Sequence, residues 1–264
     1  MASRDLSVDT SRLTAPQIFD AAKENARGEV RRSSRTLAFS GLAGGLAMGL
    51  TGLSVAAVRA NLGDGLWQNF ISYLLYPTGF IAVIIGRAQL FTENTLYPVL
   101  LILDERKQRK HYTAETLRLW SVVFVTNVLG ALLFAALVML TGAIPAGIYG
   151  QLLGLGREAV AGSAAHFFWS GVIGGWLIAL VAWVVTASHW TIGQLVMVWL
   201  LTFVVGIGQF SHCIATSGEI LSAVVAGVVS GGTYLHWLLF ATMGNIVGGV
   251  IMVSVLNYGQ VRLE

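Results

Sequence analysis

Long apolar runs without any Asp, Glu, Lys or Arg dominate this chain. Such runs cover residues 37–58, 119–140, 159–186 and 235–256. A helix needs roughly 20 predominantly apolar residues to cross the hydrocarbon core of a bilayer. Each run therefore has the length and composition of one membrane-spanning helix.

Two further apolar tracts carry polar residues in their middle. The tract 66–103 is interrupted at 87–95, and the tract 194–229 is interrupted at 206–219. Irregular backbone at membrane depth persists only where it is buried in protein or lines a watery cavity. We therefore expect broken helices as the second and fifth of six crossings, with half-helices starting near residues 94 and 218. The Gly-rich stretch 141–156 reads as a loop.

The two interruptions form part of an internal repeat. An Asn-x-x-Gly sequence follows each of them, at Asn127 and at Asn245, and we expect both amides to hydrogen-bond the broken backbone. Polar interruptions at corresponding positions of two halves point to a transport site between the halves. The alignment, with a separation of 120 residues, pairs Gly86, Gln89 and Thr92 with Gly206, Gln209 and His212.

The composition supports an all-α polytopic membrane protein. Hydrophobic residues make up 55% of the 264 residues and charged residues only 11%, whereas a soluble domain carries about 25% charged residues. The net charge of +3 does not indicate nucleic-acid binding, because the basic residues cluster at the edges of the predicted spans. The single cysteine, Cys213, provides neither a disulfide framework nor a Cys-based metal motif, so we expect no metal and no cofactor.

The distribution of basic residues predicts the topology. Seven Lys and Arg precede the first span and five lie between the second and third spans. Because loops rich in Lys and Arg stay in the cytoplasm, both termini and the loop 104–111 are expected there. The chain then divides into a cytoplasmic segment 1–36 with a surface helix starting at Thr14, a channel domain 37–256 and a cytoplasmic tail 257–264.

Four motifs together resemble the formate/nitrite transporter family over nearly the whole chain. They are QLFT at 89–92, TNVLGALLF at 126–134, FSHCIA at 210–215 and GNIVGG at 244–249. The resemblance implies an aquaporin-like protomer with an inverted repeat, assembled as a homopentamer in the inner membrane with one pore per protomer. It also implies that the substrate is a small monovalent anion such as formate, nitrite or hydrosulfide.

The resemblance places the family's pore histidine at His212 and its pore-loop threonine at Thr92. An imidazole can attract an anion or donate a proton to it near neutral pH, and a neutral acid enters an apolar slit at lower cost than a bare charge. As alternatives, His212 is a structural residue held by a carbonyl, and Thr92 caps the following half-helix. The family's apolar constrictions fall near Tyr76, Phe80, Leu90 and Val205, with Phe91 beside Leu90 in the QLFT motif.

Several residues depart from the family pattern. Ser211 replaces a Glu before the histidine, and Thr216 replaces an Asn after it. Charged side chains cost at least ~2.5 kcal/mol at the centre of a membrane span, so we expect Arg87, Glu93 and Glu219 to face water or one another. We expect Arg87 to pair with Glu219 or Glu93 and to hold the two breaks together; alternatively, it attracts anions into a vestibule.

Other functions remain open at this point. One is a neutral-solute channel of the aquaporin type, although paired Asn-Pro-Ala loops are missing. Another is a non-conducting pentameric scaffold whose pore Tyr76 and Phe80 block. We expect no enzyme, because the chain has no Ser/His/Asp pairing, His-x-x-x-His motif or Cys cluster. The identity of the anion, the direction of flow, proton coupling and gating by the N-terminal segment are left undecided.

Overall fold

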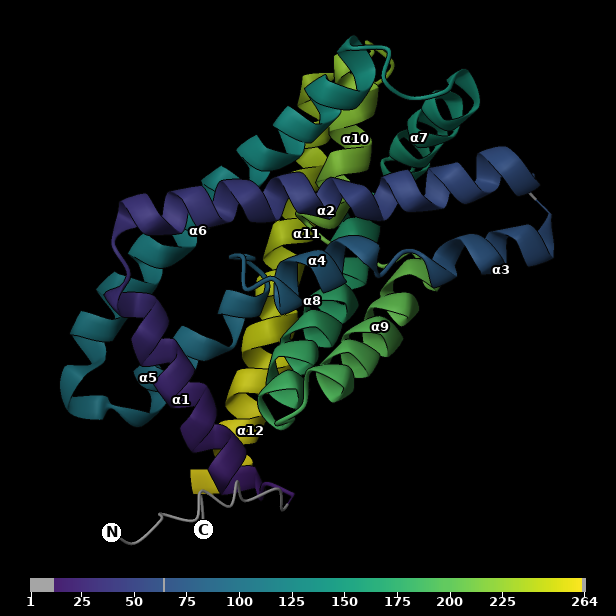
Figure 1. Ribbon diagram of the computed structural model, residues 1–264. Coiled ribbons are helices and arrows are strands. Elements are labelled where there is room, and N and C mark those ends of the chain that lie inside the picture. Colours follow the sequence, from purple (N-terminus) through teal and green to yellow (C-terminus); the bar gives the residue numbers. More distant parts are fainter. Residues whose placement is uncertain (1–11, 64, 263–264) are drawn as a thin grey trace, which may run out of the picture.

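The computed structural model describes residues 12–63 and 65–262, and no β-strand occurs among them. Residues 1–11, which include Arg4 of the predicted cytoplasmic segment, and the last two residues of the predicted tail lie outside this description. The helices are α1 (Ala15–Arg31), α2 (Ser34–Leu62), α3 (Leu66–Leu74), α4 (Thr78–Ile85), α5 (Tyr97–Asp104), α6 (Arg109–Leu140), α7 (Ala146–Ala159), α8 (Ala164–Thr186), α9 (Thr191–Ile207), α10 (Ala215–Val225), α11 (Gly231–Gly249) and α12 (Leu256–Arg262) (Figure 1). Two short 3₁₀ helices, η1 (Glu93–Thr95) and η2 (Arg106–Gln108), flank α5, and a π-helical segment, η3 (Val250–Val255), joins α11 to α12.

Apolar helices make this chain a multi-pass membrane protein. Within the described residues, five helical stretches are long and apolar enough to cross a bilayer. They are Ser34–Leu62, Leu66–Ile85, Arg106–Leu140, Ala164–Thr186 and Gly231–Arg262, and α9 and α10 are shorter apolar helices.

The interruptions lie close to the expected positions, with one shift. The first runs from the end of α4 to η1 and α5, as the polar residues predict. The second is shorter than expected, because α10 begins at Ala215 rather than near residue 218. Thr216 and Glu219 are therefore helical residues.

Two corresponding helix pairs, α2 with α6 and α8 with α11, pack through glycines. A Cβ on Gly45 would collide with the backbone of Asn127, and a Cβ on Gly175 would collide with the backbone of Asn245. Small residues allow such close approach between membrane helices. This contact brings each asparagine next to one interruption.

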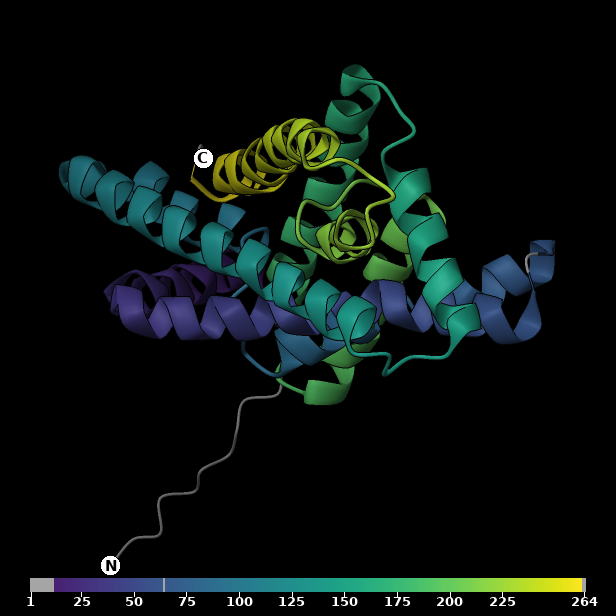
Figure 2. The ribbon, with the colours of Figure 1, turned by 90° about the horizontal axis from the view of Figure 1, so that it is seen from above.

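The helix α10 lies at the centre of the molecule. Its residues from Ala215 to Ala223 are all buried, and it packs against α2, α6, α7 and α11 (Figure 2). The expected loop at 141–156 is wrong: it contains most of α7, which buries Leu152 and Leu155. Glycines within α7 conceal its amphipathic pattern in the sequence, and burial of its apolar face stabilises the helix instead.

The helix α1 covers one side of the bundle. It begins at Ala15, where the Thr14 N–H donates to Gln17 Oε1 at 2.8 Å, as the capping sequence predicts. Lys23 pairs with Asp104, and Arg27 Nη2 lies 2.6 Å from Glu105 Oε1. These ion pairs fasten α1 to the end of α5.

Candidate functional site

Asn127 holds the first interruption through three hydrogen bonds. Its Oδ1 accepts from the Phe91 N–H at 2.9 Å, and its Nδ2 donates to Gln89 O at 2.9 Å and to Gly41 O at 2.7 Å. A buried backbone group without a partner is costly. The asparagine therefore supplies hydrogen bonds to backbone groups that lie outside any helix.

Asn245 repeats this pattern at the second interruption. Its Oδ1 accepts from the Cys213 N–H at 2.8 Å, and its Nδ2 donates to Ser211 O at 2.9 Å and to Gly171 O at 2.8 Å. The two sets of bonds correspond, but the alignment expected from the sequence is two residues out of register, because Gln89 matches Ser211 and Phe91 matches Cys213. Leu90, not Thr92, occupies the position equivalent to His212.

His212 and Thr92 meet where the two interruptions cross. His212 Nε2 lies 2.7 Å from Thr92 Oγ1, and His212 Nδ1 accepts from the Ala215 N–H at 2.9 Å. Because Nδ1 is an acceptor, the ring proton resides on Nε2 and points at Thr92. The Thr92 hydroxyl makes no cap to the following turn. Because its oxygen accepts from His212 Nε2–H, its own hydrogen remains for another acceptor.

Aromatic side chains line one approach to this junction. The Phe80 ring lies edge-on to His212, with centroids 5.1 Å apart, and Tyr76 lies 5.8 Å from Phe80. Phe80, Leu90, Thr92, Val205 and His212 have no exposed surface. The junction is therefore closed to solvent.

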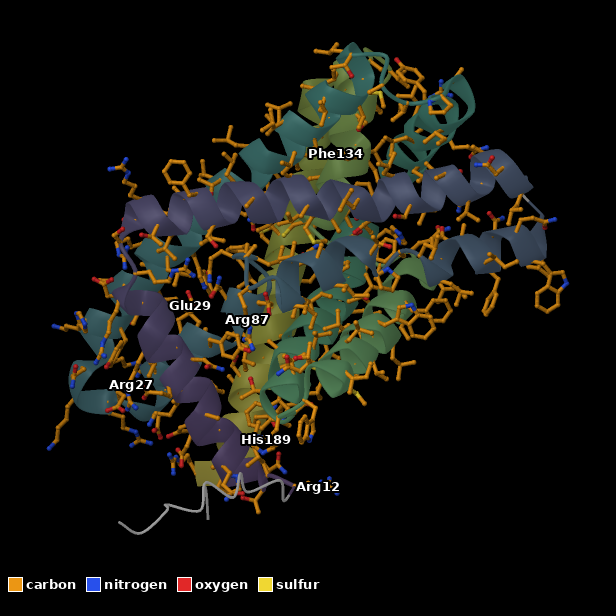
Figure 3. All side chains as sticks on the ribbon, viewed as in Figure 1. Arg12, Arg27, Glu29, Arg87, Phe134 and His189 are labelled. Carbon is orange, nitrogen blue, oxygen red and sulfur yellow. The ribbon has the colours of Figure 1, made fainter. Side chains whose placement is uncertain are left out.

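A cavity of about 260 Å³, here named the α1 cavity, lies on one side of the junction. Gln89 Nε2 donates to Glu29 Oε2 of α1 at 2.7 Å, which ties the helix to the interruption. Figure 3 places Glu29 and Arg87 near each other on this side. The other polar residues of the α1 cavity are Glu24, Asn25, Glu93, Asn94 and Tyr97.

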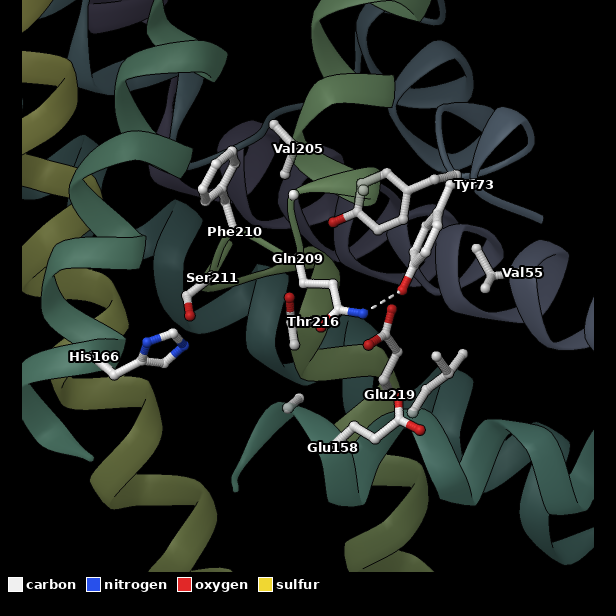
Figure 4. Close-up of a pocket in the computed structure, with 15 residues that line it drawn as sticks. Val55, Tyr73, Glu158, His166, Val205, Gln209, Phe210, Ser211, Thr216 and Glu219 are labelled. Carbon is white, nitrogen blue, oxygen red and sulfur yellow. Dashed lines mark hydrogen bonds between the residues drawn. The ribbon is translucent and has the colours of Figure 1, made fainter. Parts of the chain in front are cut away.

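A second cavity of about 180 Å³, here named the α7 cavity, lies on the other side (Figure 4). Gln209 Nε2 donates to Tyr73 Oη at 2.9 Å, and Arg59 Nη2 donates to the same oxygen at 2.9 Å. Its lining includes the predicted site residues Tyr76, Val205, Ser211, Thr216 and Glu219, together with Glu158 and His166.

The structure corrects the predicted partner of Arg87. Arg87 lines the α1 cavity and Glu219 lines the α7 cavity, so no bridge between them exists. Glu93 shares the α1 cavity with Arg87, but within the described residues Arg87 forms no direct ion pair. The backbone of Arg87 is left-handed, with φ of 59°, and this conformation ends α4.

Phe91 does not face either cavity. Its ring packs edge-on against Phe124 and Trp120 of α6, at centroid distances of 5.0 and 5.8 Å. Leu90, its neighbour, lines the α1 cavity. The sequence analysis missed Glu29, Arg59, Tyr73 and Glu158, because these residues lie on helices away from both interruptions.

The chain is similar to known membrane proteins over nearly its entire length. A family model described as formate/nitrite transporter matches residues 16–259. Inner membrane protein YfdC of Escherichia coli (strain K12) is 28% identical over 263 residues, which cover 98% of this chain and 83% of that protein. A probable formate transporter of Methanothermobacter thermautotrophicus is 30% identical over 84% of this chain and 83% of its own length.

Two solved structures have a similar fold. One, described as an FNT family ion channel, gives a TM-score of 0.75 at 18% identity and covers 92% of this chain and 98% of its own. The other is a pentameric formate channel with formate bound. It gives a TM-score of 0.72 at 17% identity and covers 88% of this chain and 98% of its own.

Proposed function

Because this chain belongs to the formate/nitrite transporter family, we propose that it carries a small monovalent weak-acid anion, of the formate or nitrite type, between the two cavities. The similarity to a probable formate transporter supports this substrate class. Transport is linked to protons through His212.

The contact between His212 and Thr92 carries this proposal. A bare anion loses its hydration on entering the apolar constriction, and the apolar wall does not compensate for that loss. At the junction, the Thr92 hydroxyl can donate to an oxygen of the anion while His212 holds the hydroxyl in place. For proton exchange, His212 Nδ1 must release the Ala215 N–H and take up a proton from water. The ring then gives one proton to the anion, which passes the junction as a neutral acid, and returns to its neutral form.

The same proposal includes the architecture. Six crossings form an inverted repeat, with the second and fifth crossings broken, and five protomers assemble with one pore each. The corresponding bonds of Asn127 and Asn245 support the repeat, and the pentameric formate channel supports the assembly. The protein lies in the inner membrane, and its α1 cavity opens toward the cytoplasm, because Lys and Arg cluster on that side.

A panel of solutes in proteoliposomes tests the transported class. Formate, nitrite, hydrosulfide, lactate and glycerol are supplied to vesicles with the protein and to protein-free vesicles. We expect protein-dependent flux of formate or nitrite and none of glycerol. Flux of glycerol alone would replace the proposal by a neutral-solute channel, and no flux at all would favour a scaffold.

A further inference from the structure

Glu219 is a buried carboxylate without a direct partner, directed into the α7 cavity. It is 8% exposed and lines the cavity (Figure 4). Across the described chain its oxygens accept no hydrogen bond and form no ion pair. A Cβ at Gly52 of α2 would lie 2.5 Å from Glu219 Cγ. The glycine therefore provides the space in which this side chain lies.

The cation beside Glu219 is engaged elsewhere. Arg59 of α2 interacts with Glu219 electrostatically, but its Nη1 lies 3.5 Å from Glu158 Oε2 and its Nη2 donates to Tyr73. Neither Lys nor Arg lines the cavity. The titratable or charged groups around Glu219 are Arg59 of α2, Tyr73 of α3, Tyr76 after α3, Glu158 of α7 and His166 of α8.

A second carboxylate or a nitrite cannot approach this site as a free anion at low cost. Two like charges that share a site cannot both remain ionised, and one proton is then held between them. An anion that reaches Glu219 is therefore accommodated together with a proton.

We propose that Glu219 is the proton-donating entrance residue of the α7 cavity, which admits the substrate as its neutral acid. This inference rests on the proposed function. The Glu219 carboxyl takes a proton from water in the cavity and transfers it to an oxygen of the anion. The Glu219 O–H bond breaks as the substrate O–H bond forms, and the carboxylate regains a proton from water.

The position of Glu219 fits this order of events. Thr216 lies one turn closer to the junction on the same helix and also lines the cavity. The neutral acid then passes Tyr76 and Phe80 to reach His212. Entrance from the α7 side thus moves one proton with each anion and no net charge.

Glu219→Gln tests the assignment, because it keeps size and polarity but cannot exchange a proton. Formate uptake from the α7 side is measured in sealed vesicles of known orientation, at several external pH values and with an imposed membrane potential. We expect wild-type uptake to rise on acidification and to be insensitive to the potential. In Glu219→Gln the pH dependence should be lost, and the residual flux should follow the potential, whereas flux from the α1 side should keep its pH dependence.

Glu115→Gln is the control. Glu115 of α6 lines neither the α7 cavity nor the α1 cavity, so its variant should keep the wild-type profile. Glu219→Asp keeps a carboxyl group and should therefore retain a pH dependence of uptake. It replaces Glu219→Gln as the test variant if the Gln variant does not fold. If folded Glu219→Gln or Glu219→Ala keeps the wild-type pH dependence of uptake, the role assigned to Glu219 is wrong, while the proposed function stands. A wild-type protein that moves neither formate nor nitrite would overturn the proposed function and this inference with it.

Discussion

The hydrogen bonds of His212 define which form of the ring occupies the junction. Protonation of both nitrogens would place a hydrogen on Nδ1, where the Ala215 N–H already points. A resting imidazolium, the form in which His212 would attract an anion by its charge, is therefore incompatible with this geometry. The neutral ring instead directs its Nε2–H at Thr92. Any positive charge on His212 requires the start of α10 to rearrange.

For the charged residues, the sequence predicts the kind of environment but not the partner. Charge in an apolar tract predicts that Arg87, Glu93 and Glu219 avoid lipid, and all three line cavities. The choice of partner failed for Arg87, because the sequence does not give the depth at which each break crosses the membrane. His212 and Thr92 were singled out through the motifs, and their contact joins two interruptions far apart in the chain.

The close helix crossings depend on individual glycines. Gly175 packs directly on the backbone of Asn245, so a methyl group there must push α8 and α11 apart. We expect Gly175→Ala to lower the free energy of unfolding by ~1–3 kcal/mol, the usual cost of overpacking. The measurement is thermal unfolding of the purified protein in detergent.

Gly150→Ala is the control for this prediction. Gly150 lies in α7, where a Cβ would meet no atom within 4 Å. Alanine is the better helix former by about 0.8–1 kcal/mol, so this variant should be neutral or more stable. Equal destabilisation by the two changes would contradict the role assigned to the glycine contact.

At the level of elements, the apolar runs predicted a multi-pass helical protein and the places where α4 and α9 end. Among the described residues, five helical stretches are long and apolar enough to span a bilayer. The apolar runs did not predict α7, because four of its residues are glycines and its stability comes from packing. They also misplaced the repeat by two residues. The alignment followed side-chain identities such as Gln89 and Gln209, whereas the structural correspondence is set by the backbone groups that Asn127 and Asn245 bind.

At the scale of the whole molecule, the attachment of α1 to the end of α5 depends on charge, because Arg27 and Lys23 of α1 form ion pairs with Glu105. Hydrogen bonds from Arg27 and then from Lys23 hold the pKa of Glu105 below its ordinary value. A carboxyl whose pKa is lowered on folding contributes stability above its unfolded pKa, and the contribution is lost as pH falls through the folded pKa. These ion pairs should therefore weaken only in acid, as the pH falls below the ordinary pKa of a Glu side chain.

Hydrogen exchange of the α1 amides, corrected for intrinsic rates, measures this effect. Protection should fall as the pH drops through the titration of Glu105, and Glu105→Gln should show lower protection already at neutral pH. Glu158→Gln, which loses an ion pair between α7 and Arg59 of α2, is the control and should leave α1 protected. Protection of α1 that does not change with either pH or Glu105→Gln would show that apolar packing alone holds the helix.

Within the described residues, a buried junction lies between two polar cavities, and the proposed transport route passes through it. His212→Asn tests this most directly, because the amide oxygen can still accept from the Ala215 N–H but the side chain cannot exchange a proton. His189→Asn, at an exposed histidine outside both cavities, is the control. Formate and nitrite uptake is measured in proteoliposomes from roughly pH 5 to 8, the range in which a histidine titrates. We expect His212→Asn to fold, to lower uptake at every pH and to flatten its pH dependence, while His189→Asn matches the wild type. A folded His212→Asn protein that keeps the wild-type rate and pH profile would contradict it.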